Sequence, residues 1–303
     1  MFHVKQSDME TLKTCPVCHY DQFSPFLLIS DFFLTKEDFA VVQCDNCGLK
    51  ITNPRPGAGE IGRYYQSLDY FSHDTSKKNL TAYLYQLARF FNLRSKYQVV
   101  SGVNLLKEKT ILDIGCGTGE FLKYCSGKGY LVCGMEPGEK SRETAQKRNG
   151  LRVEANLDPY LGEQTQFSVI TLWHVLEHIH DLEPELERIK KLIRPGGKLI
   201  LAIPNCESWD AGHYGKFWGG WDVPRHLYHF SRTTIEQLGK RSGFSLEKIL
   251  PQKLDAYYVS LLSEKYRTGR SSFVKAIISG MLSNFHARGS EKNYSSLIYI
   301  FSL

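Results

Sequence analysis

Residues 111–121 read ILDIGCGTGEF, a short apolar run followed by glycines at every second position, Gly115, Gly117 and Gly119. This pattern is typical of a buried parallel strand whose following turn approaches a ligand closely, because glycine brings no Cβ into that space. A dinucleotide turn, G-x-G-x-x-G, would need one more glycine at position 120, where the chain has glutamate. Glu136 ends the next apolar run, where a carboxylate can accept hydrogen bonds from ribose hydroxyls. The turn therefore predicts a nucleoside-bearing ligand with little phosphate.

Apolar runs alternate with helical patterns from Thr110 onward. Five runs predict buried parallel strands, and two later runs can complete the sheet: 110–115, 130–136, 151–155, 167–174, 197–204, 244–251 and 293–301. The intervening segments are mostly long enough for crossover helices. The expected fold is therefore α/β, a doubly wound, mostly parallel seven-stranded Rossmann-like sheet.

Four cysteines near the start form two knuckles, Cys15-x2-Cys18 and Cys44-x2-Cys47. Two such knuckles can close a tetrahedral four-thiolate site, which has no open position and predicts structural zinc. The alternative is two unrelated or redox-active cysteine pairs. The prolines and glycines of NPRPGAGE (53–60) then mark a boundary. We expect a zinc module at 1–56, a helical linker or lid at 57–108, and the main domain at 109–303 with a substrate loop at about 205–230.

Composition and charge narrow the functional classes. The amino-terminal residues show no signal-peptide pattern, and no apolar run reaches the length that crosses a bilayer, so a cytoplasmic location is expected. The net charge of +6 comes from scattered residues, which argues against a nucleic-acid partner and favours a small-molecule or glycan substrate. No feature fixes an oligomeric state. Segment 271–285 is partly amphipathic and predicts burial against the sheet or at a subunit contact rather than membrane association.

Further motifs follow the glycine turn in order: GMEP (134–137), FSVITLWHVLEHIHD (167–181), LIRPGGKLILAIPN (192–205) and PRHLYHFSRTTIEQLGKRSGF (224–244). With them, residues 10 to about 250 resemble the class I S-adenosylmethionine-dependent methyltransferases. The resemblance is closest to the bacterial branch that carries an N-terminal cysteine-rich zinc module and modifies sugars or surface polysaccharides. Ser168 departs from the pattern, since many relatives have aspartate there.

The resemblance implies a set of residues around S-adenosylmethionine. Asp113 and the turn would cradle the methionine end, and Glu136 would hold the ribose. Asn156 or Leu157 would lie near the adenine, and Trp173 and His174 would face the reacting centre. In chain order these residues are Asp113, Gly115, Cys116, Gly117, Gly119, Glu136, Pro137, Asn156, Leu157, Trp173 and His174.

A first histidine cluster lies in WHVLEHIHD, where His174, Glu177 and His178 share one face of any helical continuation. The string also matches an inverted zinc-protease motif, which the strand-to-helix setting disfavours. Related methyltransferases of quinone precursors and small-RNA ends bind a divalent metal through E-x-x-E-H at this place, and His174 here replaces the first glutamate. The three residues therefore predict either a metal at the acceptor hydroxyl or a hydrogen-bonded helix start that shapes the pocket.

A second cluster contains His226 and His229. In the sugar methyltransferases that the chain resembles, a histidine at the position of His226 serves as the general base. The alternative is that either histidine packs and caps a helix beginning near Ser231 or Thr233. With His174, these two histidines are the candidate catalytic residues.

Two groups of aromatic residues are open to two interpretations. Those of the 205–230 loop can stack on a sugar or base, or can cover the core; they are Trp209, Tyr214, Trp218 and Trp221. Those near the linker can form a lid over the cofactor, or can pack a helix; they are Tyr64, Tyr65, Tyr70 and Phe71.

The leading hypothesis is O- or C-methylation of a sugar, nucleotide-sugar or surface glycan. A second hypothesis is methylation of a quinone-like or other small hydroxylated metabolite. A third is a catalytically inactive adaptor built on the zinc module, and the complete set of glycines with Asp113 and Glu136 argues against it.

Overall fold

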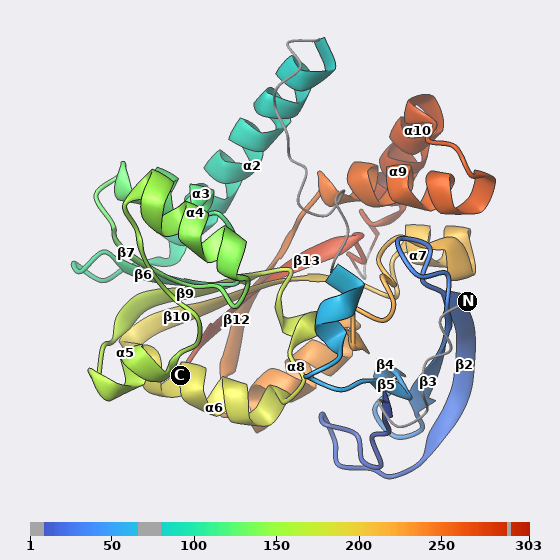
Figure 1. The fold of residues 1–303 in the computed structure, drawn as a ribbon, viewed down its shortest axis with the longest axis horizontal. Coiled ribbons are helices and arrows are strands. Elements are labelled where there is room, and N and C mark those ends of the chain that lie inside the picture. The colour runs from blue at the N-terminus through green and yellow to red at the C-terminus, as the bar shows by residue number, and fades with distance from the viewer. Residues whose placement is uncertain (1–8, 66–79, 290–291) are drawn as a thin grey trace.

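The structure, a computed structural model, describes residues 9–65, 80–289 and 292–303, with residues 80–90 described by their backbone alone (Figure 1). A seven-stranded sheet in the order β12-β13-β10-β9-β6-β7-β8 forms its centre. Its strands are β6 (Thr110–Ile114), β7 (Leu131–Met135), β8 (Arg152–Glu154), β9 (Phe167–Trp173), β10 (Ile193–Pro204), β12 (Ser245–Pro251) and β13 (Ser296–Ser302). All pairs are parallel except those of β13 with β10 and β12. The predicted doubly wound, mostly parallel sheet is confirmed.

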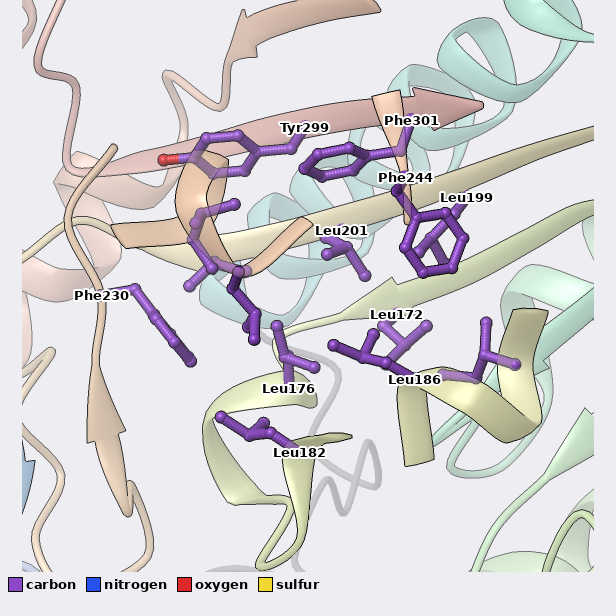
Figure 2. Packing of buried hydrophobic residues seen from close by; sticks show 14 of the residues in the cluster. Leu172, Leu176, Leu182, Leu186, Leu199, Leu201, Phe230, Phe244, Tyr299 and Phe301 are labelled. Atoms are coloured by element: carbon purple, nitrogen blue, oxygen red, sulfur yellow. The ribbon is translucent and has the colours of Figure 1, made fainter. Parts of the chain in front are cut away.

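Helices cover both faces of this sheet. In Figure 1 one layer lies above it and another below: α2 (Leu80–Val103), α3 (Glu120–Ser126) and α4 (Glu139–Asn149) above, and α5 (Asp158–Gly162), α6 (Leu182–Leu192) and α8 (Arg232–Arg241) below. The Ser231 side chain caps α8 by accepting a hydrogen bond from the backbone of Thr234. Figure 2 shows how the lower layer buries apolar side chains against the sheet, among them Leu172, Leu186, Leu199, Leu201, Phe244 and Phe301.

The chain reverses its direction of travel across the sheet beside β6. β7 and β8 follow on one side of β6, and β9 returns to pair with its other side. Parallel strands present their carboxyl ends at one edge, and ligands bind where the order reverses. The turns after β6 and β9 therefore meet at one place. Ser168 lies at the opposite end of β9, where its hydroxyl donates a 2.6 Å hydrogen bond to the carbonyl of Thr110, away from that place.

A second sheet carries the four cysteines. It has the order β11-β4-β3-β2, from β2 (Phe23–Ser30), β3 (Asp38–Cys44), β4 (Lys50–Thr52) and β11 (Tyr228–His229), and all of its pairs are antiparallel. A two-stranded ribbon of β1 (Met9–Glu10) and β5 (Arg55–Pro56) and the short helix η2 (Ile61–Tyr65) complete this part. Because β11 comes from the 205–230 segment, the first 56 residues share their sheet with that segment.

A helical hairpin, α9 (Asp255–Thr268) and α10 (Phe273–His286), is inserted between β12 and β13. It lies beside α7 (Trp209–Tyr214), which η4 (Gly215–Phe217) extends (Figure 1). Of the two environments expected for segment 271–285, burial against the sheet is wrong, because α10 contacts α9 and α7 and its large apolar side chains are exposed. The subunit contact stays a prediction. Within the described ranges, no helix combines the length and hydrophobicity that crossing a membrane requires.

Candidate active site

The turn after β6 contains three glycines with positive φ: 71° at Gly115, 55° at Gly117 and 78° at Gly119. A Cβ on Gly115 would lie 2.5 Å from Cγ2 of Val175, and one on Gly119 would lie 2.4 Å from Cδ1 of Leu151. These two glycines are therefore required for the turn to fit against the protein itself. Gly117 differs, because a Cβ there would meet no atom within 4 Å. Its bare backbone faces open space, where a ligand can approach.

Glu136 follows β7 and fixes the turn from the side. Its Oε2 accepts a hydrogen bond from the backbone of Gly117 and its Oε1 accepts one from that of Gly138, both at 2.8 Å. Each carboxylate oxygen keeps a further lone pair, so two ribose hydroxyls can still donate to it. Pro137 is exposed beside it, and its carbonyl accepts a hydrogen bond from Arg142.

Asp113 lies in β6 directly before the turn and is only 3% exposed. Its Oδ1 accepts a 2.6 Å hydrogen bond from the hydroxyl of Thr171 on β9. Burial raises the pKa of Asp113 to about 7, although Thr171 and Lys96 oppose that shift. The carboxyl group therefore sits near its titration point at neutral pH.

Lys96, on α2, reaches the same place from the helical layer. Its Nζ lies 4.9 Å from the centre of the Trp173 ring, and its pKa is lowered by burial while Asp113 and Asp255 support its charge. Trp173 is buried at the end of β9 with its ring edge-on to Phe121. No sequence pattern pointed to Lys96, since a single lysine on a helix is ordinarily a solvated side chain.

His174 follows β9 with a φ of 58°, an uncommon conformation for a residue other than glycine. Its Nε2 lies 2.8 Å from Oδ2 of Asp255, at the start of α9. Burial disfavours the protonated imidazole, but the carboxylates of Asp255 and Glu177 overcome this and raise the pKa of His174 to about 10. His174 is thus paired with the carboxylate of Asp255 and lies outside the group formed by Glu177, His178 and His226.

Glu177, His178 and His226 form a cluster that the sequence did not assemble. One potential ligand atom from each lies within 4.8 Å of the other two, and the His178 and His226 rings meet edge-on at 4.7 Å. Glu177 is 1% exposed, and neither of its carboxylate oxygens has a hydrogen-bond partner among the described residues. Its Oε1 lies 3.9 Å from Nε2 of His226. The predicted trio of His174, Glu177 and His178 thus becomes one in which His226 replaces His174.

Hydrogen bonds to backbone carbonyls fix the proton positions of both cluster histidines. Nδ1 of His178 lies 2.9 Å from the carbonyl of Arg225, and Nδ1 of His226 lies 2.9 Å from that of Gly220. A carbonyl only accepts, so Nδ1 carries the hydrogen in each ring and Nε2 keeps a lone pair in the neutral form. The cluster then brings two imidazole lone pairs and the Glu177 carboxylate together, and Nδ1 of His174 lies 3.7 Å from Oε1 of that carboxylate. Such a set suits a divalent cation or the hydroxyl hydrogen of a substrate.

The cysteine-bearing sheet positions the cluster. Thr52 of β4 donates its hydroxyl to the carbonyl of His226 at 2.8 Å and its backbone N–H to that of Leu227 at 3.0 Å. Arg225, which is 1% exposed, donates to the fully buried Asp31 at 2.9 Å. The backbone around His226 is therefore held from the N-terminal part of the chain.

The four cysteines of the two knuckles come together as predicted. Sγ of Cys15 lies 3.5 Å from that of Cys47, and Sγ of Cys18 lies 3.5 Å from that of Cys44. Sulfurs bound at about 2.3 Å to one tetrahedral zinc would be roughly 3.8 Å apart, so the spacing fits this metal.

Other predicted site residues have structural partners. His229 is buried, with Nε2 3.1 Å from the hydroxyl of Thr52. It lies outside the Glu177–His178–His226 cluster, and burial lowers its pKa well below the usual range. Asn156 is exposed, and its Oδ1 accepts a hydrogen bond from the backbone of Asp158 at the start of α5, whereas Leu157 is fully buried in the core. The Cys116 thiol lies under β7, where a Cβ on Gly134 would come within 2.6 Å of it.

The aromatic residues of the 205–230 segment mostly cover the core. Tyr214, Trp218 and Trp221 are buried in a cluster with side chains of the cysteine-bearing sheet, while Trp209 stacks on His213 and His286. Tyr214, Trp218 and Trp221 therefore cover the core, which is the second of the two roles predicted for them.

Of the aromatic residues near the linker, Tyr64 is buried, and the hydroxyl of Tyr65 lies 2.9 Å from Nδ1 of His178. Tyr70 and Phe71 fall outside the described residues.

The sheet order, the glycine turn after its first parallel strand and the acidic residue after the second define the class I S-adenosylmethionine-dependent methyltransferase fold. A family model described as a methyltransferase domain matches residues 83–249, which is more than half of the chain. The protein belongs to this methyltransferase family.

Several relatives are ubiquinone biosynthesis O-methyltransferases. The one from Saccharophagus degradans is 26% identical over 39% of this chain and 58% of its own length. The one from Pseudomonas paraeruginosa is 31% identical over 33% of this chain and 46% of its own length. The chain thus spans about half the length of these relatives. Among known structures, a methyltransferase from Archaeoglobus fulgidus aligns with a TM-score of 0.49 and 18% identity, covering 70% of this chain and 93% of that one.

Proposed function

We propose that this protein transfers a methyl group from S-adenosylmethionine to a hydroxyl oxygen of a small, quinone-like aromatic acceptor. The observation that carries the proposal is the buried cluster of Glu177, His178 and His226, which offers two imidazole nitrogens and a carboxylate to a hydroxyl group. The names of the relatives support a quinone-like acceptor over the sugar or glycan that the motifs suggested first.

The residues around the glycine turn would hold the methyl donor. The backbone of Gly117 faces the open space, and Glu136 has lone pairs for the ribose. Lys96 would pair its ammonium group with the carboxylate of the methionine end. The donor supplies an electrophilic methyl group, so the protein has to align the acceptor oxygen and remove its proton.

His226 is the proposed proton acceptor. Its Nδ1–H is held by the carbonyl of Gly220, and this leaves Nε2 directed toward Glu177. Glu177 would stabilise the imidazolium that forms when His226 takes the hydroxyl proton. Alternatively, Glu177, His178 and His226 would together hold a divalent cation, which lowers the pKa of a bound hydroxyl.

The test combines purified protein, S-adenosylmethionine with a labelled methyl group, and two sets of acceptors. Dihydroxylated benzoates with and without alkyl chains form one set, and nucleotide sugars form the other. We expect label in the aromatic ethers only. Transfer to the sugars alone would restore the glycan hypothesis, and binding of S-adenosylmethionine without transfer to any acceptor would favour the adaptor.

His226→Gln is the matched variant for the chemical step. It should lower kcat roughly 100-fold or more while the affinity for S-adenosylmethionine stays within about twofold, since loss of a general base removes about two to four orders of magnitude. His213→Gln, an exposed histidine on α7, is the control. Restoration of wild-type turnover by added Mg²⁺ or Mn²⁺, but not by alkaline pH, would favour the metal over the proton acceptor. Full activity of His226→Gln would remove His226 from both roles.

A further inference from the structure

Helix α10 has the reverse of the usual distribution of side chains on a surface helix. Small residues occupy its buried positions: Ala276, Ser279, Gly280 and Ser283. Large apolar side chains, between 42% and 69% exposed, occupy the outer positions: Phe273, Val274, Ile277, Ile278, Met281, Leu282 and Phe285. Scattered single apolar residues are normal on a protein surface, but a contiguous set of this kind marks an interaction surface.

The two sets occupy opposite sides of the helix. At about 100° per residue, the seven apolar positions from Phe273 to Phe285 span roughly 180° of the circumference, and the small residues fall in the other half. We call this outer half the apolar face of α10.

The inner half of α10 is fixed by specific contacts. A Cβ on Gly280 would lie 2.6 Å from the Tyr257 ring, so α10 approaches α9 as closely as glycine permits. Ser283 donates a 2.7 Å hydrogen bond to Asp210, a fully buried carboxylate that also accepts from Trp218. Rotation of α10 to bury its apolar face would break these contacts. The apolar face therefore points outward as part of the fold.

Exposed cations lie at both ends of this face. Arg270 and Lys275 are at the start of α10, and Lys253 and Arg288 are at its end, where Asn284 donates to the carbonyl of Lys253. None of these four cations has a carboxylate partner among the described residues.

The two carboxylates of the hairpin are engaged elsewhere. Asp255 contacts His174, and the buried Glu264 contacts Arg267. Among the residues that the structure describes, the apolar face is thus flanked by positive charge alone.

We propose that α10 lies in the surface of an anionic lipid bilayer, with its apolar face among the lipid chains near the headgroups and its flanking cations on lipid phosphates. An outward apolar half with cations at its borders is the pattern of interfacial helices, and anionic lipids add attraction for each cation. A second copy of the chain is a poorer occupant, because a two-fold contact on this face would bring the same cations together. This inference is independent of the acceptor of the methyl group.

The test is co-sedimentation of the full chain with vesicles made of equal parts of phosphatidylcholine and phosphatidylglycerol, compared with vesicles of phosphatidylcholine alone. We expect binding to the anionic vesicles only, weakened by salt. The triple variant Ile277→Ser, Ile278→Ser and Phe285→Ser should bind these vesicles at least roughly tenfold more weakly than the wild type. The pair Arg270→Glu and Lys275→Glu should lose a similar factor.

The control changes two exposed leucines away from α10, Leu105→Ser and Leu131→Ser, and should bind vesicles as the wild type does. Unchanged thermal unfolding and S-adenosylmethionine affinity would show that the variants fold. Absence of binding to anionic vesicles, or equal binding by the folded triple variant, would overturn the proposal. Equal binding to neutral vesicles would contradict the proposed preference for anionic lipids. A dimer in sedimentation that the triple variant dissociates, without vesicle binding, would assign the face to a second copy.

Discussion

At the scale of single residues, the cofactor side of the site depends on carboxylates in two different environments. Glu136 is half-buried and its charge is satisfied by two backbone amides. Asp113 is almost fully buried, and burial raises its pKa toward neutrality. One carboxylate is thus positioned beside the turn to hold a ligand, whereas the charge of the other depends on pH.

Replacing Glu136 with alanine should weaken S-adenosylmethionine binding about 10- to 100-fold, because hydrogen bonds to a charged group contribute roughly 1.5–3 kcal/mol. The variant also leaves the Gly117 amide without its partner. Calorimetric titration with S-adenosylmethionine measures the change. Glu139→Ala, an exposed carboxylate at the start of α4, is the control. Unchanged affinity in Glu136→Ala would disprove the ribose role.

Asp113 should make the stability depend on pH. Its pKa in the folded protein, about 7, is above the ordinary value of an unfolded aspartate, so the folded state binds the proton more tightly. The Asp113 contribution is therefore most favourable in acid and is lost as the pH rises toward 7. Between about pH 5 and about pH 8, the free energy of unfolding of the wild type should fall by at most roughly 3 kcal/mol relative to that of Asp113→Asn. Urea unfolding of both proteins tests this, and a constant difference would contradict the raised pKa.

At the scale of elements, the strand–turn–helix unit of β6 and α3 is fixed by its close approach to neighbouring elements. Gly119 begins α3 at a φ of 78° and lies against Leu151 and Ala145. Gly129 has a similar φ of 84° but no atom within 4 Å of its would-be Cβ. The two glycines therefore separate the cost of backbone strain from that of crowding.

Gly119→Ala should lower the free energy of unfolding by roughly 2–5 kcal/mol, the sum of the left-handed backbone and the overpacking against Leu151. Gly129→Ala should lose only about 1–2 kcal/mol, from the backbone alone. Denaturant unfolding gives both values. If the two variants lose the same amount, crowding at Gly119 is not what requires glycine.

At the scale of the whole molecule, the cysteine-bearing sheet and the cluster of Glu177, His178 and His226 form one unit. Thr52 of β4 holds the backbone of His226 and Leu227, and β11 is a strand of the same sheet. A metal in the four-cysteine site would therefore support the cluster of Glu177, His178 and His226 from a distance.

The purified chain should contain one zinc ion, and Cys44→Ser should remove it and abolish methyl transfer while the methyltransferase sheet stays folded. The reason is that the metal site stabilises the sheet of β4 and β11, whereas the strands β6 to β10 belong to the other sheet and do not depend on it. Elemental analysis, circular dichroism and S-adenosylmethionine affinity measure the three effects. Cys133→Ser, outside the four-cysteine site, is the control. Full activity in zinc-free Cys44→Ser would contradict the coupling.

The sequence by itself determined the main sheet, its glycine turn and the four-cysteine cluster. Each depends on local signals, namely short apolar runs, glycines in a turn and two cysteine knuckles, whose spacing limits the structures they can form. The methyltransferase family could be predicted from the sequence for the same reason.

Only the tertiary structure decided the rest. His226 lies with Glu177 and His178, and His174 contacts Asp255 instead. Contacts between residues far apart in the chain determine both arrangements. Lys96 entered the cofactor side from another layer, and β11 joined a distant sheet. The outward apolar face of α10 also escaped sequence reasoning. A helical pattern shows that apolar residues share one side, but only the neighbours in the fold determine which side is buried.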